Sequence, residues 1–387
     1  MAKRIRRLPD YLFARTNALK QQARARGVDV IDFGMGNPDR PAPSFIVDKL
    51  CEVARDPKAH RYSASRGLPH LRQEIARWYA GRYGVTLDPD LETIVTIGSK
   101  EGLTHLAFAI LDAGDTVIVP SPTYPIHTYS VLLAGGSLVT IPLGRPEELL
   151  ERIGAAVATM HPKPKALILS FPHNPTTATV DPGFFDGVVA FARAHGLIVI
   201  HDLAYADVVF DGYQAPSFLQ APGAKEVGVE FFSMTKSYNM AGWRVGFMVG
   251  NAAIVAALAK LKSYLDYGIF TPIQVASITA LRDGAEASRE IAATYRARME
   301  VMVDGLLKLG WEVARPRATM YLWARLPEAH RAGGSMAFAE KLLAEAGVAV
   351  SPGAGFGPEG EGFVRFALVE NEERIRQALR NMRKLTP

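Results

Sequence analysis

Lys236 lies directly after an apolar run of the chain, with Ser233 three residues before it and Arg244 eight residues after it. A lone lysine is usually a solvated surface charge. An amine that follows a buried strand can instead form a Schiff base with an aldehyde. A serine hydroxyl and an arginine guanidinium at this spacing can hold a phosphate. These three residue types therefore suit a ligand that carries both a phosphate and an aldehyde.

Three further positions offer polar groups after apolar runs. Gly98-Ser99-Lys100 opens an expected helix, where backbone N–H groups can bind an anion. Asn174 lies in an Asn-Pro turn and can present its amide to a ligand oxygen. Asp202 ends an apolar run, and Tyr205 follows three residues later; a carboxylate there is costly unless it pairs with a cation. Taken singly, each position also fits an ordinary turn or helix cap.

Seven short β-branched or aliphatic runs predict strands, with helices between several of them. Runs that are apolar on both faces are typical of central strands covered by helices on both sides. The sequence thus predicts an α/β domain with a seven-stranded, mostly parallel sheet sandwiched by helices. The last two strands are joined by only a loop, so one strand can run antiparallel. The strands are expected at Glu92–Ile97, Thr116–Pro120, Leu138–Pro142, Lys165–Ser170, Leu197–Asp202, Glu230–Met234 and Val245–Gly250, and helices at Leu71–Tyr83, Lys100–Leu111, Phe184–His195 and Ile254–Tyr264.

The polar groups named above all follow or flank these predicted strands. Ligands of open α/β sheets bind outside the carboxyl ends of the strands, so the phosphate cradle, amide, carboxylate, tyrosine, lysine and arginine are expected to meet at one edge. The ligand that this set implies has a phosphate, a pyridinium-like cation, a ring oxygen and an aldehyde. Pyridoxal 5′-phosphate has all four.

The sequence pattern changes after about residue 285. The expected elements there are an Arg-rich helix, two strands and two further helices, which predict a smaller α+β domain. The N-terminal segment before about Pro43 is expected to pack on it. We expect residues 44–284 to form the large cofactor-binding domain, and residues 1–43 and 285–387 to form the small domain with an N-terminal arm. The elements are Ala285–Leu309, Thr319–Arg325, Ser335–Ala346, Phe363–Leu368 and Glu372–Lys384.

Charge and cysteine content exclude several classes of protein. The chain has 44 basic and 39 acidic residues, a net charge of +5, and residues 1–26 carry much of the excess. This segment is interpreted as a solvated helix face, because no nucleic-acid-binding motif follows it. It also lacks the apolar core of a signal peptide. The single cysteine, Cys51, excludes a disulfide framework and a Cys-based metal site. A cytoplasmic protein that binds no nucleic acid is expected.

Neither a metal site nor a membrane span is expected. His173, His195 and His201 do not have the spacing of metal ligands. Thr116–Gly144 is uncharged, but four prolines and three glycines interrupt it. A membrane helix needs about 20 continuous apolar residues, so this run is interpreted as strand, loop, helix and strand.

Over nearly its whole length the chain resembles the fold type I aminotransferases, the aspartate-aminotransferase superfamily. The combination of Asn-Pro, Asp-x-x-Tyr, Ser-x-x-Lys and Gly-x-Arg is specific to that superfamily. Within it, the chain is most similar to the bacterial glutamate–pyruvate (alanine) aminotransferase branch. The stretches that carry the closer resemblance are Ile31–Asp39, Thr96–Gly102, His201–Gly212, Lys236–Gly250 and Lys262–Gln274.

The resemblance implies a role for each matching residue. Lys236 matches the lysine that bonds the cofactor aldehyde and then moves the Cα proton. Asp202 matches the carboxylate that pairs with the pyridine nitrogen, and Asn174 and Tyr205 match the donors to the ring oxygen. Tyr124 matches the aromatic residue that stacks on the pyridine. Lys236, Asp202 and Tyr205 are the expected catalytic residues.

The resemblance also implies binding residues. Arg365, in Val-Arg-Phe, matches the arginine that grips the substrate α-carboxylate, and Asn174 also faces the substrate. Gly36 lies on the loop that closes over the substrate. Tyr62 matches a tyrosine that reaches the phosphate of the neighbouring subunit, which implies a homodimer with shared sites. The residues that match the phosphate site are Ser99, Lys100, Ser233 and Arg244, the first two chiefly through their backbone.

The sequence departs from this pattern at two positions. Many relatives have glycine after Asn-Pro-Thr, where this chain has Thr177. Many have glycine before the Tyr-Leu-Trp strand, where it has Ala318-Thr319-Met320. Neither departure removes a catalytic group, but both lie near the expected site, where they could tune substrate choice.

The expected activity is transfer of an amino group between L-alanine/pyruvate and 2-oxoglutarate/L-glutamate by a ping-pong mechanism. Aspartate, aromatic, methionine or LL-diaminopimelate substrates are the alternatives within the same reaction. A carbon–sulfur lyase on the same scaffold is a further alternative, although nothing in the sequence demands a leaving group. A nicotinamide dehydrogenase is disfavoured because no G-x-G-x-x-G follows an expected strand and opens an expected helix; the one match, Gly355–Gly360, comes after a helix and before a strand. A regulator would need an added DNA-binding domain.

Overall fold

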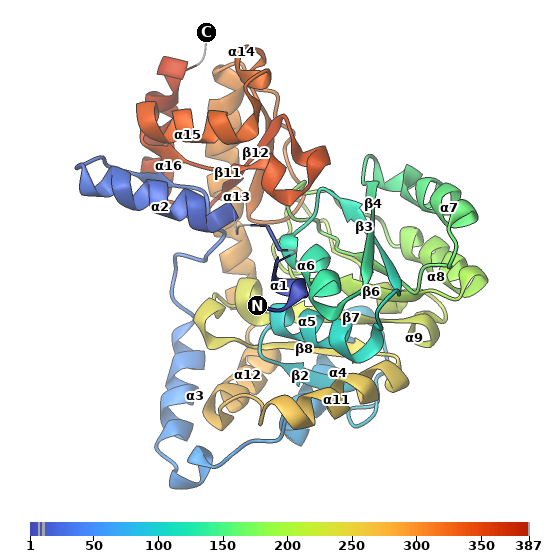
Figure 1. The fold of residues 1–387 in the computed structure, drawn as a ribbon. Helices are drawn as coiled ribbons and strands as arrows, with labels where there is room; N and C mark the ends of the chain where they lie inside the picture. Colours follow the sequence, from blue (N-terminus) through green and yellow to red (C-terminus); the bar gives the residue numbers. More distant parts are fainter. Residues whose placement is uncertain (7, 10–11, 386–387) are drawn as a thin grey trace.

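The structure is a computed structural model that describes residues 1–6, 8–9 and 12–385 (Figure 1). Its centre is a seven-stranded sheet with the order β2-β8-β7-β6-β5-β3-β4. All of its strand pairs are parallel except those of β8, which runs antiparallel to both neighbours. The predicted seven-stranded, mostly parallel sheet is therefore confirmed. Its strands are β2 (Thr93–Thr96), β3 (Thr116–Ser121), β4 (Ser137–Pro142), β5 (Ala166–Leu169), β6 (Ile198–Asp202), β7 (Gly228–Ser233) and β8 (Gly246–Gly250).

Two apolar cores sandwich this sheet, because successive strand residues point to opposite faces. On β7, for example, Phe231 belongs to one core and Phe232 to the other. Both phenylalanines are fully buried, which explains the unbroken apolar runs of the sequence. One face is covered by α3 (Ser44–Ala54), α4 (Pro69–Tyr83), α7 (Leu149–Thr159), α8 (Gly183–His195) and α12 (Thr271–Asp283), and the other by α5 (Ser99–Ile110), α6 (Pro125–Ala134) and α11 (Ala252–Leu265).

The smaller lobe has its own core and contains both ends of the chain. Its main sheet is antiparallel, in the order β11-β12-β9, and β1 pairs in parallel with β10. In Figure 1 the blue helix α2 lies beside the red and orange C-terminal helices. The predicted α+β domain built from both chain ends is confirmed. Its elements are α2 (Leu12–Ala25), β1 (Ile31–Asp32), α13 (Ala285–Lys308), β9 (Tyr321–Arg325), α14 (Glu328–Arg331), α15 (Gly334–Ala346), β10 (Val348–Ala349), β11 (Ser351–Pro352), β12 (Phe363–Ala367) and α16 (Glu372–Met382); three one-turn helices lie elsewhere, α1 (Lys3–Arg6), α9 (Ala224–Val227) and α10 (Met234–Ser237).

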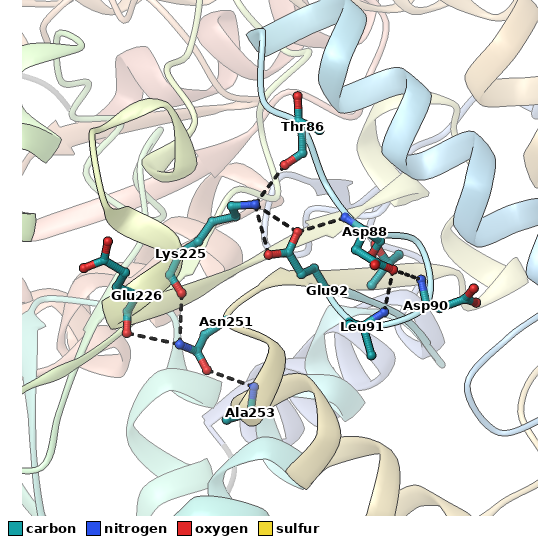
Figure 2. Close-up of polar contacts among 10 residues, drawn as sticks. Thr86, Asp88, Asp90, Leu91, Glu92, Lys225, Glu226, Asn251 and Ala253 are labelled. Carbon is teal, nitrogen blue, oxygen red and sulfur yellow. Dashed lines mark hydrogen bonds and ion pairs between the residues drawn. The ribbon is translucent and has the colours of Figure 1, made fainter.

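A polar network lies at the end of the large sheet where β2 and β7 begin and the antiparallel β8 ends (Figure 2). Lys225 Nζ donates to the Thr86 carbonyl and to Glu92 Oε2, both at 3.0 Å. Asn251 donates to the Lys225 carbonyl at 2.9 Å and caps α11 by accepting from the Ala253 N–H at 3.0 Å. These contacts fix the beginning of β2. The chain continues from the other end of β2 to Gly98, just before α5.

The basic N-terminal segment is only partly a solvated helix face. Lys20 on α2 is 6% exposed, and its Nζ lies 2.7 Å from Asp32 Oδ2. Arg24 also faces Asp32, at 3.7 Å. A buried ammonium must be paired. Ion pairs with Asp32 therefore hold α2 against β1. Arg7 and Asp10 lie outside the described residues.

The uncharged run Thr116–Gly144 forms β3, a loop, α6 and β4, as predicted. No helix among the described residues is long and apolar enough to cross a membrane.

Candidate active site

A cavity of about 400 Å³ lies where the ends of the large sheet meet the smaller lobe. The predicted site residues converge on it from distant parts of the chain. Tyr62 is the exception: it is 85% exposed, with its ring beside that of Tyr267 at 4.6 Å. The predicted residues that line the cavity are Gly36, Ser99, Lys100, Tyr124, Asn174, Asp202, Tyr205, Ser233, Lys236, Arg244 and Arg365.

The direction of the strands explains this convergence. β2, β3, β5, β6 and β7 run the same way, so the residues that follow them lie at one edge. β8 runs the opposite way, so the residues before it, including Arg244, lie at that same edge. The antiparallel strand therefore brings Arg244 to the start of α5, although 144 positions separate it from Lys100.

The start of α5 forms a cradle that only small residues permit. Gly98 has φ +74°, and a Cβ there would collide with the Arg244 guanidinium. A Cβ on Gly246 would lie 2.8 Å from the Ser99 nitrogen. Arg244 itself has φ +57°, a conformation that is uncommon for residues other than glycine. Backbone N–H groups and a guanidinium are thus held together at a helix N-terminus, which suits a phosphate.

Asp202 has one oxygen paired and one free. Its Oδ2 lies 2.9 Å from Nε2 of His127, and Nδ1 of that histidine lies 2.8 Å from Thr123 Oγ1. Oδ1 is buried and has no hydrogen-bond partner. An orphaned carboxylate oxygen is costly, so this one calls for a donor such as a protonated ring nitrogen. Sequence reasoning missed His127, which lies three residues after Tyr124 on the following helix.

Asn174 links Tyr205, the other predicted donor to the cofactor ring oxygen, to Arg365, the residue predicted to bind the substrate carboxylate. Its Nδ2 donates to the Tyr205 hydroxyl at 3.3 Å, and its Oδ1 accepts from Arg365 Nη1 at 2.7 Å. Burial raises the pKa of Tyr205 well above its ordinary value, and nearby Tyr321 adds to that effect. The Tyr205 phenol therefore keeps its proton and can donate it.

Lys236 is half-buried and lies in the cavity wall. Burial lowers the pKa of Lys236, the positive charges of Arg365 and Arg244 lower it further, and Tyr321 opposes them. The neutral amine is the form that attacks a carbonyl or takes a proton. Nζ donates to the Gly36 carbonyl.

Arg365 is 2% exposed and has donors left over. Nη1 donates to Asn174, and Nη2 donates to the Gly34 carbonyl at 3.2 Å and to Ser351 Oγ at 3.3 Å. Nε is buried and unpartnered. Since a guanidinium has five N–H donors, two remain for a carboxylate.

The loop after β1 contacts both Lys236 and Arg365, through the carbonyls of Gly36 and Gly34. Arg298 on α13 anchors the far end of this loop, donating from Nη1 and Nη2 to the two carboxylate oxygens of Asp39 at 2.7 Å each. The loop is therefore positioned to respond when either cavity group changes partner.

Each of the two stretches that depart from the glycine pattern contains one residue with the backbone that glycine favours, Thr177 in the first and Thr319 within Ala318-Thr319-Met320 in the second. Thr177 has φ +63° and Thr319 has φ +79°. A β-branched residue in this region costs on the order of 1–3 kcal/mol. The Thr319 N–H donates to the Val208 carbonyl at 2.7 Å, and its hydroxyl accepts from the Tyr321 N–H at 3.2 Å. These bonds stabilise the strained turn and fix the start of β9 beside the site.

Tyr321 is the largest side chain in the cavity wall that sequence reasoning missed. It lies on the expected strand Thr319–Arg325, two residues after Thr319. The sequence pattern assigns no role to its side chain. The other lining residues that were missed are Met35, Asn37, Ser170, Ala204, Thr235, Ala241 and Gly242.

One group of side chains in the described part of the chain has the geometry of a metal site: Glu101, His105 and Asp266. Lys262 lies among them, and its Nζ donates to Glu101 at 2.9 Å and to Asp266 at 2.8 Å. The ammonium already supplies the positive charge that these carboxylates need.

Comparison with known proteins agrees with this geometry. Residues 28–382 match the family described as aminotransferase class I and II. The chain belongs to this family. Aminotransferases of class I and II use pyridoxal 5′-phosphate, and the free Asp202 oxygen and the glycine cradle at Gly98 fit its ring nitrogen and its phosphate.

Individual aminotransferases are similar over nearly the full length. The glutamate–pyruvate aminotransferase AlaC of Escherichia coli is 55% identical over 99% of this chain and 93% of its own length. An LL-diaminopimelate aminotransferase of Moorella thermoacetica is 46% identical over 99% and 98%. The solved structure of a Thermus thermophilus aspartate aminotransferase double mutant has a TM-score of 0.91 at 29% identity, covering 100% and 99%. The predicted fold type I is therefore confirmed, and the chain is an aminotransferase.

Proposed function

We propose that this aminotransferase moves the amino group between L-alanine/pyruvate and 2-oxoglutarate/L-glutamate. The observation that carries the amino-transfer chemistry is the arrangement of Lys236, Asp202 and Arg365 around one cavity. The choice of alanine and glutamate is supported by the 55% identity to AlaC. Substrates such as LL-diaminopimelate are the alternative, supported by relatives at lower identity.

Each residue has a distinct role in this proposal. Arg365 binds the substrate α-carboxylate, which directs the Cα–H bond toward Lys236. The Nζ of Lys236 would hold the cofactor aldehyde, and its free amine would take the proton from Cα. When bound, pyridoxal 5′-phosphate supplies a ring that accepts the electrons left at Cα. Asp202 would keep a proton on the ring nitrogen. The phosphate group would be held by the backbone of Ser99 and Lys100 at the N-terminus of α5, together with Ser233 and Arg244.

Single-substrate titration tests this function. We expect purified holoprotein to lose its visible absorption band when L-alanine or L-glutamate is added without an oxo acid, and pyruvate to restore the band. Initial rates with both substrates should give parallel double-reciprocal lines, because the two half-reactions are separate. If alanine leaves the band unchanged while another amino acid removes it, amino transfer stands and the substrate assignment is wrong.

Arg365→Lys is expected to raise KM for both amino acids by about 10- to 100-fold, because lysine is a point charge that cannot make two parallel bonds to a carboxylate. Steady-state kinetics with alanine and with glutamate measure this. Arg325→Lys is the matched control, since Arg325 lies on neighbouring β9 and its guanidinium is half exposed, 3.6 Å from Glu312. An unchanged KM in the Arg365 variant contradicts the assigned role.

We also propose a homodimer with shared active sites. Tyr62, Tyr264 and Tyr267 are 85%, 84% and 64% exposed and belong to neighbouring segments, which suits burial against a second copy. A cytoplasmic location is supported by the single cysteine, Cys51. The domain boundaries remain those predicted, with residues 44–284 in the large domain and the two ends of the chain in the small one.

A further inference from the structure

Tyr321 lies between three groups that the proposed reaction uses. It is 3% exposed and lines the cavity from β9 of the smaller lobe. Its hydroxyl lies 3.0 Å from the hydroxyl of Tyr205, which follows β6 of the large lobe. A Cβ on Gly36 would collide with this hydroxyl, so the loop residue whose carbonyl accepts from Lys236 packs directly on Tyr321.

The ring of Tyr321 packs against one face of Arg365, the arginine expected to bind the substrate carboxylate. The Arg365 guanidinium carbon lies 4.1 Å from the centroid of the Tyr321 ring and 4.6 Å from that of Phe356. A guanidinium is attracted to an aromatic face, more strongly when it is desolvated. Two aromatic residues in contact with the guanidinium fix its plane, and with it the direction of the donors that remain free.

The hydroxyl of Tyr321 determines where the Tyr205 proton points. Tyr205 has one O–H, and its oxygen already accepts from Asn174 Nδ2 at 3.3 Å. If Tyr321 donates the second bond, the Tyr205 proton is free to point into the cavity. If Tyr321 accepts instead, that proton is used within the pair.

The spacing of the two tyrosines is fixed by the backbone, although they come from different lobes. The Thr319 N–H donates to the Val208 carbonyl at 2.7 Å, and the Phe210 N–H donates to the Arg317 carbonyl at 2.9 Å. The Val208 N–H donates in turn to the Tyr205 carbonyl at 3.2 Å. The start of β9 and the segment after β6 therefore move together, and the strained Thr319 is part of this attachment.

We propose that Tyr321 is a positioning residue for amino transfer: its ring orients Arg365 toward the substrate carboxylate, and its hydroxyl donates to Tyr205 so that Tyr205 can donate to the cofactor ring oxygen. This inference rests on the proposed function and adds to it a residue that joins the substrate-binding and cofactor-binding groups.

The charges around Tyr321 give this arrangement a pH dependence. Burial favours the neutral phenol, but Arg365, Lys236 and the hydrogen bond with Tyr205 outweigh it and lower the pKa of Tyr321 below its ordinary value. Once Tyr321 ionises it can only accept, so the Tyr205 proton turns away from the cofactor. Activity should therefore fall at a lower pH than the ordinary phenol pKa would give.

Two variants separate the ring from the hydroxyl. Tyr321→Phe keeps the aromatic face and removes the hydroxyl, whereas Tyr321→Leu removes both. Tyr295→Phe is the matched control, because Tyr295 is a buried tyrosine of the same small-lobe core. Three quantities are measured on holoprotein: the dissociation constant of propanoate, which is the carbon skeleton of alanine without its amine; kcat and KM against pH; and the visible band of the bound cofactor against pH.

Tyr321→Phe is expected to bind propanoate within about twofold of wild type, to lose about three- to tenfold in kcat, and to lose the basic limb of both pH profiles. Tyr321→Leu is expected to weaken propanoate binding and raise KM by about tenfold or more. The inference is overturned if the Phe variant keeps the wild-type kcat and pH profiles, or if the Leu variant binds propanoate like wild type. A wild-type protein that transfers no amino group would overturn the proposed function instead.

Discussion

Replacing Lys236 by alanine is expected to reduce turnover by at least about 10³-fold, because the amine both holds the cofactor and moves the Cα proton. The structure shifts this amine toward the neutral form that both roles need. Its pKa is lowered by burial first and by the charges of Arg365 and Arg244 next. Among the described residues that line the cavity the other lysine is Lys100, which lies at the phosphate end, at the start of α5, and is not placed to replace it.

Borohydride reduction checks the attachment independently of turnover. Reduction of wild-type holoprotein should add the mass of the reduced cofactor to the peptide that contains Lys236, and the alanine variant should carry no such adduct. Lys225→Ala is the matched control, because Lys225 lies in the polar network away from the cavity. Substantial turnover by the Lys236 variant, or an adduct on another lysine, would refute the central assignment.

The large sheet could be predicted because the apolar pattern of each strand indicates that both of its faces are buried. Runs such as Leu197–Ile200 are apolar at every position, as is typical of a strand covered on both faces. Once the strands were placed, the rule that ligands bind at their carboxyl ends brought Asn174, Asp202 and Lys236 to one edge. The structure places these three side chains around one cavity. The antiparallel course of β8 was indicated by the short connection before it.

The residues that were missed owe their roles to contacts made across the fold. His127 matters because it lies 2.9 Å from Asp202, which is 75 positions away in the chain. Tyr321 matters because it lies against Tyr205 and Arg365, and these three residues come from three different segments. Nothing local in the sequence distinguishes these side chains from ordinary core residues. Lys20 was misread for the same reason, because its partner Asp32 lies on the next strand rather than on its own helix.

The departures from the glycine pattern could be predicted only in part: their location follows from the sequence, but their backbone conformation does not. The sequence located Thr177 and Thr319 near the site by their distance from Asn174 and from the Tyr-Leu-Trp strand. It could not show that both adopt a positive φ, because threonine disfavours that region and predicts an extended backbone. The surrounding hydrogen bonds, which exist only in the folded chain, outweigh the local preference.

Asp202→Asn is expected to lower kcat by about 10³-fold while leaving the cofactor attached to Lys236. An amide is neutral and cannot stabilise a proton on the ring nitrogen, so the ring loses its ability to accept electrons from Cα. The free Oδ1 makes this position sensitive, because it is the buried oxygen that has no partner within the protein. The visible band should therefore remain while chemistry at Cα stops.

Exchange of the alanine Cα proton with deuterium in D₂O isolates this step, because it requires removal of the proton and not completion of transfer. We expect the Asp202→Asn rate to fall as far as kcat does. His127→Asn is the graded comparison: it keeps the carboxylate and removes the ring that orients it, so a loss of about 10- to 100-fold is expected, as for other residues that orient a ligand through hydrogen bonds. If Asp202→Asn exchanged deuterium at the wild-type rate, the carboxylate would have no part in proton removal, and the pairing of Oδ1 with the ring nitrogen would have to be abandoned.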